Sequence, residues 1–88
     1  MSRHHIKLLS KGRTDENAGI GYDKSLRTFF LVGFKDEETE QPEIQLGTKL
    51  QEFPSLQSIV EAARARGYSI AGLYTDAIIS MMREFSQE

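Results

Sequence analysis

Residues 25–48 carry the clearest alternation of hydrophobic and polar positions in this chain. The pattern predicts a strand over residues 25–35, a polar turn over residues 36–42 and a return strand over residues 43–48. Successive side chains of a strand point to opposite faces. One face of the first strand carries Leu26, Thr28, Phe30, Val32 and Phe34, and the other carries Arg27, Phe29, Leu31, Gly33 and Lys35. Both faces are therefore apolar, so either helices cover both or one is left for a partner.

The C-terminal half predicts two helices. Ser55 is a suitable N-cap, and Gly67 supplies a left-handed stop for the first helix. Its apolar stripe at i, i+3, i+4 and i+7 consists of Leu56, Ile59, Val60 and Ala63. The second helix is expected from Leu73 to Phe85, with Tyr74, Ile78, Met81, Met82 and Phe85 on one face. We interpret that face as core rather than as a Met-rich partner surface, and we expect the first stripe to pack on the Phe30 face of the strand.

The N-terminal third gives weaker patterns. Ile6–Leu9 is a candidate first strand, residues 1–5 are a candidate disordered segment, and the glycine-containing stretch 12–23 is expected to be a loop. Strands followed by helices predict one α+β domain over residues 1–88. We expect a small antiparallel sheet of two to three strands, in the order β-β-β-α-α, with the two C-terminal helices packed on one face.

Composition narrows the class of protein. Hydrophobic residues make up 39% of the 88 residues, which is a small core for an independent domain and favours further burial in a homodimer. The chain has no cysteine and no apolar run of membrane-spanning length, so we expect a cytoplasmic protein without a membrane partner. Residues 1–35 hold seven basic and three acidic residues, whereas residues 36–88 hold four basic and ten acidic residues.

The candidate chemical motifs are all incomplete. Gly19-Ile-Gly21 lacks the third glycine and the following helix of a dinucleotide-binding loop. His4 and His5 would point to opposite faces of a strand, so they could not jointly bind one metal ion. Residues 36–40 lack the spacing of a calcium loop. The sequence predicts no catalytic group, no cofactor and no metal ion, and therefore a protein that is not an enzyme.

Two interaction surfaces follow from these patterns. The favoured hypothesis is a non-catalytic protein-interaction or regulatory module that self-associates, or binds a protein partner, through Arg27, Phe29, Leu31 and Lys35 on the second face of its sheet. The alternative is a nucleic-acid-binding accessory protein that uses its basic N-terminal strand and loop. The candidate cations for that role are Arg3, Lys7, Lys11, Arg13 and Lys24. The pI of about 5.7 and the lack of a known nucleic-acid-binding motif make it the second choice.

Overall fold

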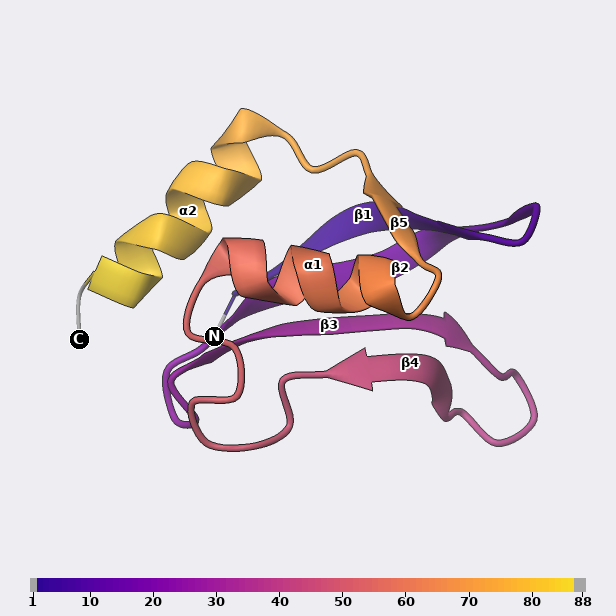
Figure 1. Ribbon diagram of the computed structural model, residues 1–88, viewed down its shortest axis with the longest axis horizontal. Helices are drawn as coiled ribbons and strands as arrows, with labels where there is room; N and C mark the ends of the chain where they lie inside the picture. Colours follow the sequence, from indigo (N-terminus) through magenta and orange to yellow (C-terminus); the bar gives the residue numbers. More distant parts are fainter. Residues whose placement is uncertain (1, 87–88) are drawn as a thin grey trace.

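The computed structural model describes residues 2–86, and within them the chain forms one sheet of five strands and two helices (Figure 1). The elements are β1 (Ser2–Ser10), β2 (Arg13–Asp23), β3 (Thr28–Lys35), β4 (Pro42–Leu46), α1 (Leu56–Ala65), β5 (Ser69–Ala71) and α2 (Thr75–Ser86). The strand order across the sheet is β4-β3-β2-β1-β5, and each neighbouring pair is antiparallel. The α+β class is confirmed.

The expected sheet of two to three strands is wrong, and so is the order β-β-β-α-α. Residues 12–23 were expected to be a loop, yet most of them form β2, the middle strand of the sheet. Ala18, Ile20 and Tyr22 are fully buried, and Gly19 and Gly21 alternate with them, so this stretch has the period of a strand. The glycines of the stretch predict a turn, and Gly12 does lie in one, but strand pairing on both sides fixes the backbone of Gly19 and Gly21.

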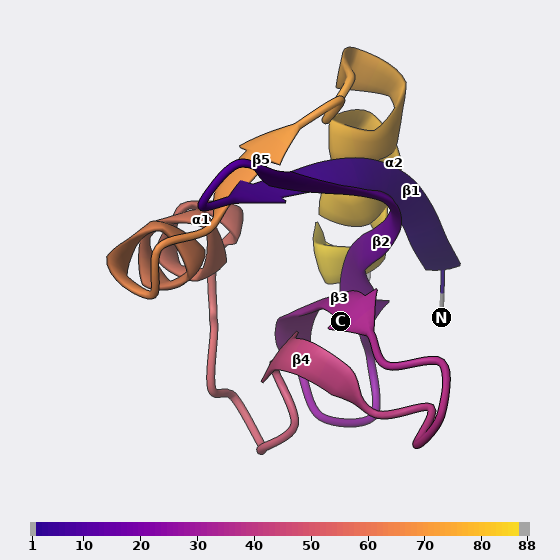
Figure 2. The same cartoon turned by 90° about the vertical axis from the view of Figure 1, so that its right-hand side faces the viewer.

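Two further segments that were not predicted as strand join the sheet. β1 begins at Ser2, so residues 2–5 of the candidate disordered segment belong to this strand, and Met1 lies outside the described residues. The link between the helices contains β5, whose Ile70 pairs with Leu8 of β1 at the edge of the sheet. In Figure 2, α1 lies beside the sheet, and α2 stands apart from α1. The link between the helices therefore adds an edge strand to the sheet rather than forming a simple turn.

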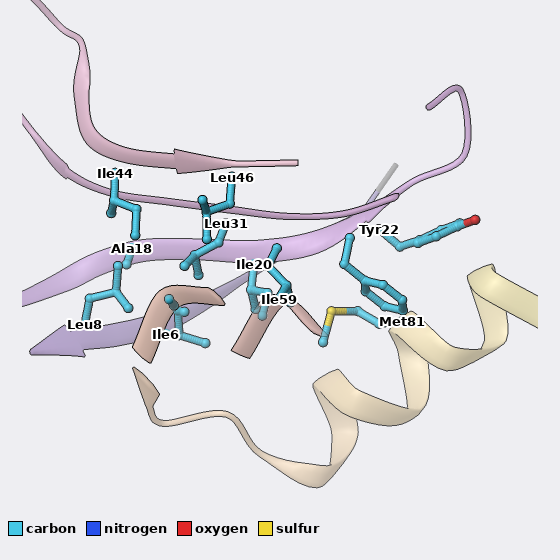
Figure 3. Close-up of a cluster of buried hydrophobic side chains, with 12 residues drawn as sticks. Ile6, Leu8, Ala18, Ile20, Tyr22, Leu31, Ile44, Leu46, Ile59 and Met81 are labelled. Atoms are coloured by element: carbon cyan, nitrogen blue, oxygen red, sulfur yellow. The ribbon is translucent and has the colours of Figure 1, made fainter. Parts of the chain in front are cut away.

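The helices cover the face of β3 that carries Phe29 and Leu31, so the expected packing on the Phe30 face is wrong. Phe29 and Leu31 have no solvent exposure, whereas Phe30 and Val32 are half-buried. The buried apolar residues are Ile6, Leu8, Ala18, Ile20, Tyr22, Phe29, Leu31, Ile44, Leu46, Ile59, Ala63 and Met81. Figure 3 shows the labelled side chains of this cluster between the strands and the two helices.

Strand neighbours explain why this face became the core. In the antiparallel register Leu31 lies opposite Ile20 of β2 and Leu46 of β4, and Phe29 lies opposite Tyr22. On the other face, Phe30 and Val32 lie opposite Gly21 and Gly19, which offer no side chain to pack against. Packing the helices on the Phe29 face therefore buries more apolar area than packing them on the Phe30 face. The larger area removed from water favours the Phe29 face as the core.

The sequence pattern of α1 is confirmed. The Ser55 hydroxyl accepts a hydrogen bond from the Ser58 amide at 3.1 Å, and the Ser58 hydroxyl accepts one from the Ser55 amide at 3.3 Å, which makes a capping box. Gly67 has φ of +88°, the left-handed conformation expected at the stop. Ile59 and Ala63 of the predicted stripe are fully buried against the sheet.

A connector of close backbone contacts joins β4 to α1. The Phe29 amide donates to the Phe53 carbonyl at 3.1 Å, and the Phe53 amide donates to the buried Thr28 hydroxyl at 2.8 Å. Gly47, at φ of +82°, lies against the backbone of β3, where an added Cβ would overlap the Phe29 carbonyl oxygen. These contacts fix where α1 begins and hold it over the core face.

Candidate interaction surfaces

The predicted partner-binding residues do not form one surface. Phe29 and Leu31 lie in the core beneath the helices, so the expectation that they sit on an uncovered face is wrong. Arg27 is exposed in the turn between β2 and β3, at φ of +52°. Lys35 is exposed at the far end of β3. The sequence does not identify these two residues as core, because Tyr22 and Ile20, the apolar neighbours of Phe29 and Leu31, belong to β2, for which the sequence predicts a loop.

The uncovered face of the sheet instead presents Phe30 and Val32, both half-buried. Phe30 lies opposite Gly21, and Gly21 lies opposite Arg3 of β1, so an aromatic and a cationic side chain flank a glycine across three strands. The Arg3 guanidinium lies over Gly19, at a position that a Cβ on Gly19 would overlap. Gly19, which has no side chain, therefore makes a flat floor that lets Arg3 lie across the strand.

A shallow hollow of about 470 Å³ opens on the same face near the far end of β3. Its charged lining is mixed, with Arg3 and Lys35 set against Asp15, Glu37 and Glu40. Asp15 is already engaged, because its carboxylate accepts hydrogen bonds from the Phe34 amide at 2.6 Å and the Asn17 amide at 2.9 Å. A surface of this balance does not select an anionic ligand by charge.

The five cations considered for nucleic acid are dispersed. Lys11 lies in the turn at one end of β2 and Lys24 in the turn at the other end, about 35 Å apart for a strand of this length. Lys7 lies 3.5 Å from Glu16. Arg13 is held by Glu43 through two hydrogen bonds of 2.7 and 3.2 Å. Of the five, Arg3 is the one placed beside an aromatic residue of the uncovered face.

Arg13 and Glu43 belong to a polar cluster that joins three parts of the fold. The Tyr68 hydroxyl donates to Glu43 Oε2 at 2.7 Å, and the Arg13 guanidinium stacks 4.5 Å from the centre of the Phe34 ring. Hydrogen bonds from Arg13 and then from Tyr68 lower the pKa of Glu43 to about 2. The hydrogen bond to Glu43 raises the pKa of Tyr68 above its usual value of 10.0.

This cluster ties β2 to β4 and to the segment that follows α1. The Arg13 guanidinium donates to both carboxylate oxygens of Glu43 and lies against the Phe34 ring, and the Tyr68 hydroxyl donates to the same carboxylate. Among residues 2–86 no group of three or more histidine, aspartate or glutamate side chains could hold a metal ion. His4 lies opposite Ile20 and His5 opposite Gly19, so the two histidines point to opposite faces as expected.

The largest exposed apolar area of the helical layer lies on α2. The exposed fractions are 75% for Tyr74, 46% for Ile79, 43% for Met82 and 38% for Phe85. Met81 is fully buried, and Phe85 packs against Tyr22 and Phe29 with ring centres 5.7 and 5.8 Å apart. The interpretation of the whole apolar face as core is therefore right for Met81 and wrong for Tyr74 and Met82. We call Tyr74, Ile79, Met82 and Phe85 the α2 flank.

The helical period explains how α2 has apolar residues on two sides. Met81 and Phe85 are four residues apart and face the sheet. Ile79 lies about 160° around the helix from Met81, and Met82 lies between those two directions. Figure 1 shows that, among the elements of residues 2–86, none covers the side of α2 that is turned away from the sheet and α1. The apolar arc is thus wider than the sheet can cover.

Comparison with protein families, with curated proteins and with solved structures finds no match for this chain. Within the part of the chain that the structure describes, no helix is long and apolar enough to cross a membrane.

Proposed function

We infer that this chain is a non-catalytic protein-interaction module that self-associates through the α2 flank. The supporting observation is the exposure of four large apolar side chains on or next to one short helix. Scattered single apolar residues are common on protein surfaces, but Ile79, Met82 and Phe85 follow one another at three-residue spacing on α2, and adjacent exposed apolar residues mark an interaction site more often. Cytoplasmic residence remains a prediction from the cysteine-free composition.

The α2 flank is a stronger candidate than the uncovered sheet face. Phe30 and Val32 are half-buried, and Arg3 already lies across the glycine floor beside them. On α2, by contrast, Ile79 and Met82 are exposed over more than two fifths of their surface. The free energy gained on association grows with the apolar area that is removed from water. Association through α2 should therefore be more favourable than association through the sheet face.

Sedimentation equilibrium across a range of protein concentrations tests this proposal. Wild type should show a concentration-dependent rise in mass, and Ile79→Ser with Met82→Ser should remain monomeric with an unchanged circular dichroism spectrum. Leu50→Ser is the matched control, because Leu50 is 66% exposed but lies far along the chain from α2, in the connector before α1. A wild-type protein that is monomeric up to about 1 mM would rule out functional self-association through this surface.

Nucleic-acid binding through the uncovered sheet face is the second candidate. The specific observation in its favour is the alignment of Phe30 and Arg3 across Gly21, because aromatic and guanidinium groups on an open sheet can stack bases. Fluorescence anisotropy with a single-stranded oligonucleotide tests it. Phe30→Ala should weaken binding by about 1–3 kcal/mol if one base stacks there, whereas Val32→Ala should have less effect. Binding that is equal in Phe30→Ala and wild type would remove this candidate.

A further inference from the structure

We propose that the partner of the α2 flank is a second copy of this chain, with the two α2 helices packed antiparallel about a two-fold axis near Ile79. This rests on the proposed self-association, because it gives the geometry by which two copies meet at the same surface. The observation behind it is the position of two charges beside the flank. Asp76 lies three residues before Ile79 and Arg83 lies four residues after it, so both border Ile79 on the same side of the helix.

The spacing of these charges sets the orientation. Asp76 and Arg83 are seven residues apart, which is two helical turns and about 10.5 Å along the axis. When two such helices run antiparallel about a point midway between them, Asp76 of each copy lies opposite Arg83 of the other. A parallel pair would instead place like charges at the same level. Within residues 2–86 neither Asp76 nor Arg83 has an ion-pair partner.

The positions along one side of α2 fit the same arrangement. Thr75, Ile79, Met82 and Ser86 recur at i, i+4, i+7 and i+11, the spacing by which two helices pack together, with apolar Ile79 and Met82 at the centre and small polar residues at the ends. An antiparallel pair then brings the two Ile79 side chains together at the axis, with Met82 of each copy within one helical turn of them, and sets Tyr74 level with Phe85 of the second copy. Met81 and the sheet-facing side of Phe85 stay in the core of each copy, so dimerisation needs no rearrangement of the fold.

The size of the contact predicts its strength. α2 has 12 residues and is about 18 Å long, so a contact along it is smaller than the roughly 800 Å² per partner of a standard interface. We therefore expect a reversible dimer with a dissociation constant in the micromolar range. The charge pairs lie at the rim of the seam, so added salt should weaken the dimer.

Asp76 and Arg83 also stabilise their own helix, and the experiment must separate this effect from their contact across the dimer. Asp76 in the first turn and Arg83 in the last turn each interact favourably with the dipole of their own helix. A charge swap at either position would weaken the helix as well as the dimer. The double swap is decisive because it makes both dipole interactions unfavourable but restores opposite charges across the two-fold axis.

The test compares Asp76→Arg, Arg83→Asp and the double variant by sedimentation equilibrium, with circular dichroism as the measure of folding. We expect each single swap to raise the dissociation constant about tenfold, and the double swap or an equimolar mixture of the two single variants to bring it back close to wild type. A double variant weaker than both single variants would assign the effect to the helix dipole and overturn the proposal.

Cross-linking tests the orientation independently, because the chain has no cysteine of its own. A mixture of Asp76→Cys and Arg83→Cys proteins should oxidise to a disulfide-linked heterodimer, and Asp76→Cys alone should not, since bridged Cα atoms lie within about 7 Å. Rapid cross-linking of Asp76→Cys to itself would indicate a parallel pair and overturn the antiparallel dimer. If the orientation fails but Ile79→Ser with Met82→Ser still abolishes self-association, the proposed function stands and this geometry does not.

Discussion

Replacing Leu31 with alanine tests which face of β3 is the core. Leu31 has no solvent exposure and lies between Ile20 and Leu46 in the register of the sheet. Leu→Ala at a buried site costs about 2–5 kcal/mol, from lost transfer free energy and from the cavity that remains. β3 itself is hydrogen-bonded to β2 on one side and to β4 on the other, so its backbone cannot collapse easily into that cavity, and we expect a loss of about 3 kcal/mol.

That loss is large for a chain of this length. Eighty-eight residues correspond to a free energy of unfolding of about 4–13 kcal/mol. With a urea dependence of about 1.5 kcal/mol per molar, the midpoint of unfolding should fall by about 2 M. The assay is urea unfolding followed by circular dichroism at low protein concentration, so that dimerisation does not add to the apparent stability.

Val32→Ala is the matched control on the opposite face. Val32 is the next residue on the same strand, is half-buried and lies opposite Gly19, so its truncation should cost less than about 1 kcal/mol. A midpoint shift for Val32→Ala equal to or larger than that for Leu31→Ala would refute the assignment of the core face. It would also restore Phe29 and Leu31 as candidates for a surface.

Two further predictions concern the backbone and the polar cluster. Gly47→Ala should destabilise the protein by roughly 2–4 kcal/mol, measured by urea unfolding. Gly12→Ala is the control, because Gly12 has a similar positive φ but no atom within 4 Å of the added Cβ, so it should cost only the backbone strain of about 1–2 kcal/mol. Equal losses for the two variants would show that the contact between Gly47 and β3 is unimportant. Because the pKa of Glu43 falls to about 2 on folding, its contribution to stability is present above its unfolded pKa of 4.5 and is lost as the pH falls from 4.5 towards 2. Thermal unfolding of Glu43→Gln should lack that part of the pH dependence; the same profile as wild type would contradict the assignment.

The α1 helix and the return of the chain from β3 to β4 could be predicted from the sequence, because their signals are local. Each signal for α1 acts on neighbouring residues. Ser55 caps the start of the helix, the apolar stripe that ends at Ala63 lines one side of it, and Gly67 stops it. The alternation of residues 25–35 likewise predicted β3, although the strand begins at Thr28 because residues 25–27 belong to the turn. Such features need no knowledge of distant residues.

The core face and the interaction surface were decided by tertiary structure. Both faces of β3 are apolar in sequence, and the choice depended on whether Ile20 and Tyr22 or Gly19 and Gly21 lie beside them in β2. A signal was present, since residues 18–22 alternate with period two, but three glycines in residues 12–23 favoured a loop. Strand pairing from both sides overrode that local preference.

The charge pattern of α2 shows the same division between local and tertiary information. The sequence determined that α2 is amphipathic and carries Asp76 and Arg83 two turns apart. It did not determine how wide an apolar arc the sheet would cover, because that depends on where β5 leaves the sheet and where Phe85 meets Tyr22 and Phe29. A helix period specifies which residues share a side, and only packing against the rest of the chain decides which side meets water.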